Sequence, residues 1–202
     1  MRARLIRFTA SQRLLHWFMA ICIISMLFIG IGMISAVTPK YLTLIQIHKA
    51  LGIAILVLAL IRLTLRMVYG APALPSDLPL MDRFAAISSE HVFYALMIGM
   101  PLIGWGMLSA SSHPVILFSS VHLPPILPVN PGLYTLLRRA HYCLALVFFV
   151  LILVHFSAMI FHKMVKNDGI FETMAPTLAA RGASEPVSDS IDCGGAHADK
   201  VG

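Results

Sequence analysis

Charge is scarce in this sequence. Only 12% of the 202 residues are charged, 58% are hydrophobic, and the mean hydropathy is +0.85. A soluble domain carries about 25% charged residues. So few polar side chains cannot cover a water-facing surface, which excludes a soluble globular protein and predicts a protein that lies in lipid.

Cysteine is also scarce. Cys22, Cys143 and Cys193 form neither a disulfide framework nor a metal-binding spacing, and the absence of Cys-x-x-Cys-His excludes covalent attachment of a c-type haem. Acidic residues number nine against fifteen basic ones, which gives a net charge of +6 with histidine neutral. Because the basic residues flank apolar runs instead of forming a patch, they indicate membrane topology and not nucleic-acid binding.

Four apolar runs are long enough to span a bilayer, whose hydrocarbon core of about 30 Å needs about 20 residues. They are predicted at 14–36, 44–67, 88–110 and 139–162. The first run lacks a small-residue cleavage site followed by a polar mature domain, so we interpret it as a retained span and not a signal peptide. The expected fold class is all-α, an integral membrane four-helix bundle over residues 1–175. Residues 176–202, rich in Ala, Gly, Ser and Asp, are expected to form a disordered tail.

Lysine and arginine are unevenly distributed about the four runs. One side has Arg2, Arg4, Arg7, Arg13, Arg62, Arg66, Arg83, Lys163 and Lys166. The other side, here called the outer side, has Lys40, Lys49, Arg138 and Arg139. Because cytoplasmic loops are enriched in basic residues, both termini are expected in the cytoplasm.

Five histidines lie within the predicted spans, and all except His91 pair at two matched depths. A histidine inside a membrane helix is costly and needs a partner. His16 and His155 are expected at the inner level, and His48 and His141 at the outer level. His141 and His155 are separated by about 21 Å along one helix and lie within about 40° of one face. A single membrane histidine is more often a helix contact than a ligand, but these four pair by depth.

Two histidine pairs in one apolar bundle suit two haem groups, each held by two imidazoles between facing helices. Zinc fits less well, because no carboxylate or thiolate lies at these levels. Gly52, one turn after His48, would let a macrocycle approach. Arg62 and Arg66 either pair with haem propionates or anchor the inner end of the second span. Other glycines that would admit a macrocycle, or simply let helices pack, are Gly30, Gly32, Gly99, Gly104 and Gly106.

The remaining histidines leave alternatives open. His91, near the inner end of the third span, has no unpaired partner at its level and is interpreted as structural or haem-adjacent. His162, at the inner interface, either lines a quinone pocket or extends toward headgroups. His113 and His122 lie in a Pro-rich connection and are expected to be solvent-exposed or packed, with a catalytic role as the alternative. His197 has no assigned role.

The order of these motifs resembles the prokaryotic cytochrome b561 family, and within it the di-haem superoxide:ubiquinone oxidoreductases. The similarity extends from residue 7 to residue 175. It rests on Arg13-x-x-His16-Trp17, the segment 48–52, Arg-Leu-x-x-Arg at 62–66, Pro-x-Ile-Gly at 101–104, and the pair His141 and His155.

The resemblance implies that His16 and His155 hold one haem iron and that His48 and His141 hold the other. It also implies electron transfer between a donor and a quinone in the bacterial inner membrane. The tail and the apolar, Pro-rich connection at 111–135 depart from the family pattern, which leaves the donor open.

The outer connections lack acidic residues. Residues 37–43 and 111–137 contain no Asp or Glu, while Lys40, Arg138 and Arg139 lie in or beside them. Such a face attracts small anions. We therefore expect superoxide as the donor, steered by these three residues, and ubiquinone as the acceptor; the alternative is that short loops lack acids by chance. A proton route to the quinone is needed, for which the candidates are Glu90, His162 and Lys163.

Two other functions stay open. The same haem scaffold can serve as an electron-transfer subunit between the quinone pool and a periplasmic redox partner, such as a hydrogenase or a reductase. From another class, a non-haem transporter or metal-handling bundle also has four apolar spans.

Overall fold

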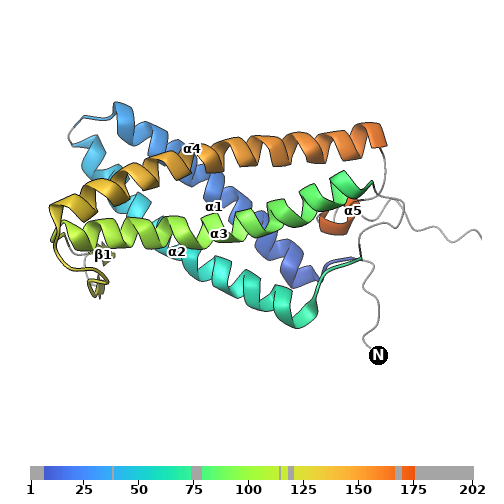
Figure 1. Ribbon diagram of the computed structural model, residues 1–202, viewed down its shortest axis with the longest axis horizontal. Coiled ribbons are helices and arrows are strands. Elements are labelled where there is room, and N and C mark those ends of the chain that lie inside the picture. Colours follow the sequence, from blue (N-terminus) through green and yellow to red (C-terminus); the bar gives the residue numbers. More distant parts are fainter. Residues whose placement is uncertain are drawn as a thin grey trace, which may run out of the picture.

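The computed structural model describes residues 7–37, 39–73, 79–113, 115–117, 121–166 and 170–175. In chain order its elements are α1 (Ala10–Ser35), α2 (Lys40–Tyr69), α3 (Leu80–Ala110), β1 (Val115–Leu117), β2 (Val121–Leu123), α4 (Pro131–Phe161), the π-helical turn η1 (His162–Lys166) and α5 (Ile170–Met174). The four long helices alternate in direction, with the strands at one end and α5 at the other (Figure 1). We call these the hairpin end and the tail end.

All four long helices are long and apolar enough to cross a membrane, which confirms the predicted four-span, mainly helical fold. The helices begin before the apolar runs predicted from 14, 44, 88 and 139, at Ala10, Lys40, Leu80 and Pro131. Capping explains part of the difference. Thr9 and Gln12 form a capping box ahead of α1, and the Asn130 side chain accepts a hydrogen bond from the Leu133 N–H. Polar residues next to a cap are therefore helical although they lie outside the apolar run.

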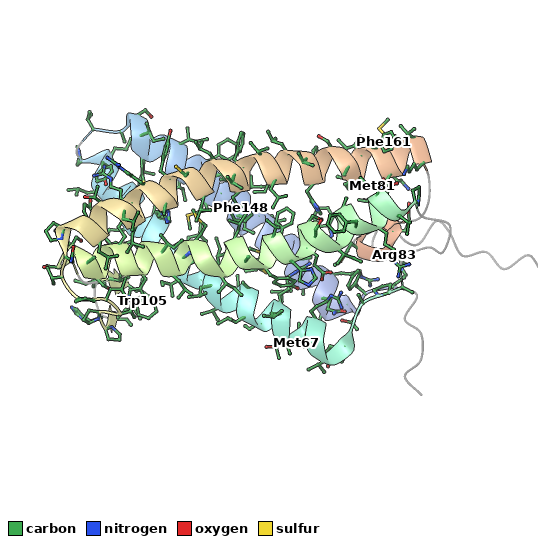
Figure 2. All side chains as sticks on the ribbon, viewed as in Figure 1. Met67, Met81, Arg83, Trp105, Phe148 and Phe161 are labelled. Atoms are coloured by element: carbon green, nitrogen blue, oxygen red, sulfur yellow. The ribbon has the colours of Figure 1, made fainter. Side chains whose placement is uncertain are left out.

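The buried core is small and lies midway along the bundle. Its members, which include at least one residue from each long helix, are Met19, Ala59, Leu96, Met97 and Phe148. Phe148 lies between α4 and α3 (Figure 2), two helical turns from both His141 and His155. Most other large apolar side chains are exposed, as expected for a surface that contacts lipid. The core thus separates the two histidine levels.

The connection between α3 and α4 folds over the hairpin end as a small antiparallel hairpin of β1 and β2. Val115 is buried, and the Trp105 indole N–H donates to the Pro124 carbonyl at 3.0 Å. The hairpin is thereby held against α3. The outer connection expected at 111–137 thus contains two short strands, and its last residues, 131–137, belong to α4. Three-residue strands are too short to show a readable alternation.

At the tail end, α5 contacts α1 and the residues just before it. The Arg7 guanidinium donates two hydrogen bonds to the Glu172 carbonyl, at 2.7 and 3.1 Å. The Trp17 indole N–H donates to the Met174 carbonyl at 2.9 Å. Lys163 forms an ion pair with the Glu172 carboxylate. The segment after α4 is therefore packed against the first helix.

Candidate functional site

Histidines of α2 and α4 meet at the hairpin end. The ring centroids of His48 and His141 are 6.1 Å apart, and the ring planes make an angle of 66°. Both side chains are half-buried, and Nδ1 of each is buried without a hydrogen-bond partner. Buried polar atoms are normally hydrogen-bonded, but neither imidazole is held in place by a protein hydrogen bond at this nitrogen.

Histidines of α1 and α4 form a second cluster at the tail end. His16 lies within electrostatic range of His155 and of Arg62 on α2. Phe93 of α3 packs edge-on against His155, with ring centroids 5.0 Å apart and planes at 75°. Nη1 of Arg62 is buried without a hydrogen-bond partner. This cluster therefore combines two imidazoles, a cation with a free donor and an aromatic wall.

The hairpin-end pair has the spacing that a shared metal needs. An imidazole nitrogen binds a first-row metal at about 2 Å, and about 1 Å separates that nitrogen from the ring centre, so two imidazoles on opposite sides of one metal have centroids about 6 Å apart. The observed separation is 6.1 Å. Within the described part of the chain, no group of three or more His, Cys, Asp or Glu could hold a metal ion. A metal here must bring its other ligands with it, as the iron of haem does.

The two arginines predicted near the inner haem differ in their partners. Arg66 is bound by Glu90 of α3 through two hydrogen bonds of 2.6 and 3.1 Å. Arg62 lies one turn earlier, beside Tyr94 and close to both tail-end histidines. Arg62 alone therefore keeps a buried guanidinium nitrogen available to an anionic group. The sequence did not single out Glu90 as the partner of Arg66.

Two glycines lie near the histidine levels. A Cβ on Gly104 of α3 would meet His141 Cε1 at 3.3 Å, which is tighter than ordinary contact. A Cβ on Gly52 of α2 would meet Met26 Cε at 3.7 Å, an ordinary contact with a flexible side chain. Close helix packing therefore does not require glycine at position 52, whereas a Cβ at position 104 would force the His141 ring to shift by a few tenths of an ångström.

The basic residues predicted to steer an anion are exposed at the hairpin end. Lys40 begins α2, and Arg138 and Arg139 lie in α4. Arg138 Nη1 donates to the Tyr134 hydroxyl at 3.5 Å. Arg139 is two residues before His141 and so points to the opposite side of the helix. Of the two arginines, Arg138 is the better oriented toward the histidine pair.

The other histidines are dispersed. The exposed His91 has Nδ1 2.7 Å from the Ile87 carbonyl, a contact within its own helix. His113 contacts the Ser111 carbonyl at 2.8 Å, and His122 is exposed in β2. Their arrangement supports the structural and solvent-exposed interpretations.

His162 is half-buried and lies edge-on to Phe161, at a centroid distance of 6.1 Å. It begins the π-helical turn η1, a form often found at functional sites. His197 and the predicted tail, 176–202, lie outside the described residues.

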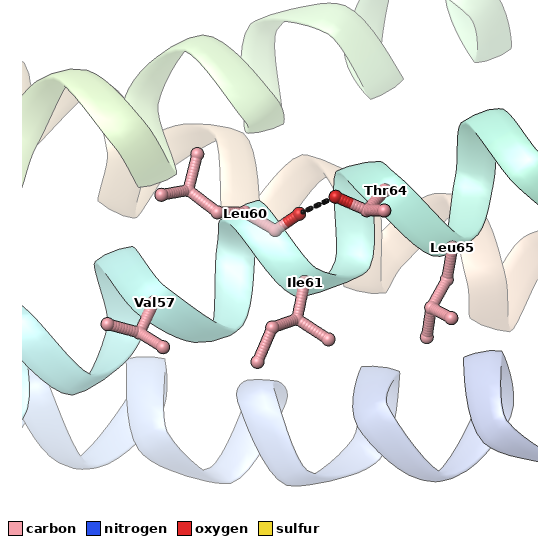
Figure 3. A pocket seen from close by; sticks show the side chains of 5 residues that line it. All are labelled: Val57, Leu60, Ile61, Thr64 and Leu65. Atoms are coloured by element: carbon pink, nitrogen blue, oxygen red, sulfur yellow. Dashed lines mark hydrogen bonds between the residues drawn. The ribbon is translucent and has the colours of Figure 1, made fainter.

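A shallow groove on α2 carries no reactive group. Val57, Ile61 and Leu65 point toward α1, and Leu60 and Thr64 complete the lining (Figure 3). The Thr64 hydroxyl donates to the Leu60 carbonyl at 2.9 Å. With its one polar side chain satisfied, this groove is suited to contact with lipid.

Four membrane helices that bring His48 and His141 together at one end and His16 near His155 at the other have the architecture of a membrane cytochrome of the b type, which binds haem without covalent bonds. Comparison with known proteins agrees. Residues 7–177 match the family described as prokaryotic cytochrome b561. The chain belongs to that family.

Individual relatives are more distant. Cytochrome b561 homolog 1 of Escherichia coli (strain K12) is 25% identical over 178 residues, which cover 84% of this chain and 97% of the relative. Cytochrome b561 homolog 2 of the same strain is 27% identical over 80% of this chain and 88% of its own length. A probable superoxide oxidase, CybB, of Yersinia pestis is 30% identical over 65% of this chain and 74% of its own length. The chain is thus a multi-pass membrane cytochrome that binds haem b and transfers electrons, which removes the non-haem alternative.

Proposed function

We propose that this cytochrome holds two haem b groups, one between His48 and His141 and one between His16 and His155. The observation that carries the proposal is the facing pair at the hairpin end, whose ring centroids are 6.1 Å apart, the separation expected of two imidazoles that share one metal. The second pair joins α1 to α4, and its α4 member, His155, follows His141 by fourteen residues. Bound haem b supplies a reversible one-electron couple at its iron.

Residues of the chain would position the haem groups and balance the charge of their carboxylates. Arg62, with its free buried nitrogen, would bind a haem carboxylate at the tail end. Arg66 contributes less, because Glu90 already occupies it. Gly52, one turn from His48, is next to the flexible end of Met26, which would have to move to admit a macrocycle.

We further propose that superoxide is the electron donor at the hairpin end and ubiquinone the acceptor at the tail end, with both termini in the cytoplasm of a bacterium. Two superoxide anions each lose one electron and become O₂, and ubiquinone takes up two electrons and two protons. The distribution of charge between the two ends supports an anionic donor at the hairpin end. The described acidic residues are Asp82, Glu90 and Glu172, which all lie in the tail-end half, whereas Lys40 and Arg138 are exposed at the hairpin end.

Proton delivery to the quinone is assigned to the tail end. Glu90 and Lys163 are ion-paired there, with Arg66 and Glu172 respectively. His162 is half-buried beside Phe161 and next to Lys163. We propose His162 as the residue closest in chemistry to a quinone ligand, because an imidazole ring offers both a hydrogen-bond donor and an acceptor to a quinone oxygen.

An exposed basic face also suits an acidic redox protein, which gives the second candidate, an electron carrier between the quinone pool and a periplasmic partner. Stopped-flow mixing of the purified oxidised cytochrome with superoxide distinguishes the two. The first proposal predicts haem reduction at the α-band, followed by formation of ubiquinol. Reduction by ubiquinol but not by superoxide, in protein that contains both haems, would overturn the choice of donor and favour the carrier.

A further inference from the structure

We propose that α3, which carries none of the four paired histidines, sets the orientation of both α4 imidazoles, through Gly104 at His141 and Phe93 at His155. Both are positioning residues, since each acts on a ligand and not on a substrate. The inference rests on the proposed two-haem function. It adds which residues would fix the ring planes of two histidines that would hold haem.

At the hairpin end, α3 lies so close to His141 that even a Cβ at Gly104 would require the ring to shift slightly. A Cβ at Gly104 would lie 3.3 Å from His141 Cε1 and 3.6 Å from Nδ1. The Met100 carbonyl, one turn earlier on α3, also lies near this ring but outside hydrogen-bond geometry. The backbone of α3 therefore forms the wall against which the His141 ring rests.

At the tail end, α3 supplies a large side chain instead of none. The Phe93 ring meets the His155 ring edge-on at 5.0 Å and 75°. Phe93 is itself held by Phe148, at 6.0 Å and 65°, and Phe148 is 7% exposed within the core cluster. Phe93 is thus fixed from behind and can restrict rotation of the His155 ring.

Packing is important for the orientation of the His141 and His155 rings. Metal-binding histidines usually have their ring plane fixed by a hydrogen bond from the second ring nitrogen. His141 Nδ1 lacks such a bond, and the His155 ring is packed against the edge of Phe93. Contact with α3 replaces the hydrogen bond, so a change in α3 should alter one haem at a time.

The test is a crossed pair of substitutions, Gly104→Ala and Phe93→Leu, in the full-length protein purified with haem. Low-spin EPR spectra of the oxidised protein depend on the angle between the two axial ring planes, and a redox titration gives a potential for each haem. His48→Ala and His16→Ala identify which signal belongs to which end. Matched controls on α3 are Gly99→Ala, where a Cβ would meet nothing within 4 Å, and Phe84→Leu, where the ring is 71% exposed.

Gly104→Ala is expected to shift the EPR signal and potential of the hairpin-end haem only, and Phe93→Leu those of the tail-end haem only. Phe93→Tyr, which keeps the ring edge, should restore the tail-end signal. Loss of the hairpin-end haem alone from Gly104→Ala also supports the proposal, because the added methyl group acts on His141. Signals that match those of the controls, or a shift of both haems in either variant, would overturn it. If wild-type protein itself lacks two low-spin signals, the two-haem function fails instead.

Discussion

At the scale of single residues, neighbours decide what each basic side chain can bind. Arg62 and Arg66 are one turn apart on α2. Only Arg66 meets a carboxylate, that of Glu90 at 2.6 Å, while Arg62 keeps Nη1 buried and unpartnered. A charge-assisted hydrogen bond contributes about 1.5–3 kcal/mol, so the two arginines should differ measurably in how they retain a haem carboxylate.

Arg62→Gln should weaken retention of the tail-end haem by about tenfold or more, because a charge-assisted bond of about 1.5–3 kcal/mol is lost. Haem content after repeated dilution and reconcentration measures the effect. Arg66→Gln is the matched control and should keep its haem, since it loses only a partly exposed ion pair. Equal loss of haem from both variants would contradict the assignment of Arg62.

The histidine pairs could be predicted from the sequence, whereas their surroundings could not. Depth along an apolar span follows from counting residues at a constant rise, so His48 with His141 and His16 with His155 emerge from arithmetic. The contact of Phe93 with His155 depends on how α3 is rotated against α4. No local pattern in a uniformly apolar helix fixes that rotation.

At the scale of elements, two indole groups tie the polar connections to the membrane helices. Trp17 of α1 donates to the Met174 carbonyl in α5 at the tail end. Trp105 of α3 donates to the Pro124 carbonyl beyond the hairpin at the other end. Each bond joins a short element, with little core of its own, to a long helix. The two short elements should therefore open independently.

Replacing either tryptophan by phenylalanine removes the donor and keeps a ring. Trp17→Phe should speed amide hydrogen exchange in 170–175 by roughly fivefold, because a hydrogen bond contributes about 1 kcal/mol. Trp105→Phe should do the same in 121–127 and leave 170–175 unchanged. Each variant controls for the other. Unchanged exchange in both segments would show that these bonds do not hold the connections.

The four membrane-spanning helices could be predicted from the sequence because their apolar runs are long. Their ends were not, because the first turns are polar and are held in the helix by caps such as Thr9 with Gln12. The hairpin at Val115–Leu117 and Val121–Leu123 was also missed. A Pro-rich stretch with two short strands has no periodic signal, and its pairing is fixed by contact with α3.

At the scale of the whole molecule, charge is divided between the two ends. The described acidic residues belong to the tail-end half, where Arg83 is also found (Figure 2). The hairpin end exposes Lys40, Arg138 and Arg139. An uncompensated basic face raises the encounter rate with small anions by about tenfold or more at low salt.

The rate of haem reduction by superoxide should therefore fall several-fold as salt rises from about 0.01 M to about 0.15 M, because the screening length shortens from about 30 Å to about 8 Å. Arg138→Gln should reduce both the rate and its salt dependence, while Arg83→Gln at the tail end should change neither. Stopped-flow measurements at the two salt concentrations provide the comparison, with an uncharged quinol as a salt-independent reductant. A salt-independent superoxide rate would contradict steering.

Two separate histidine pairs that share α4 are the central claim, and haem content per chain tests it most directly. A pyridine haemochrome assay on purified protein should give about two haems in the wild type and about one in each of His16→Ala, His48→Ala, His141→Ala and His155→Ala. The residual spectrum should be the same within each pair and different between pairs. The claim would be contradicted by one haem or none in the wild type, or by four variants that all lose the same haem.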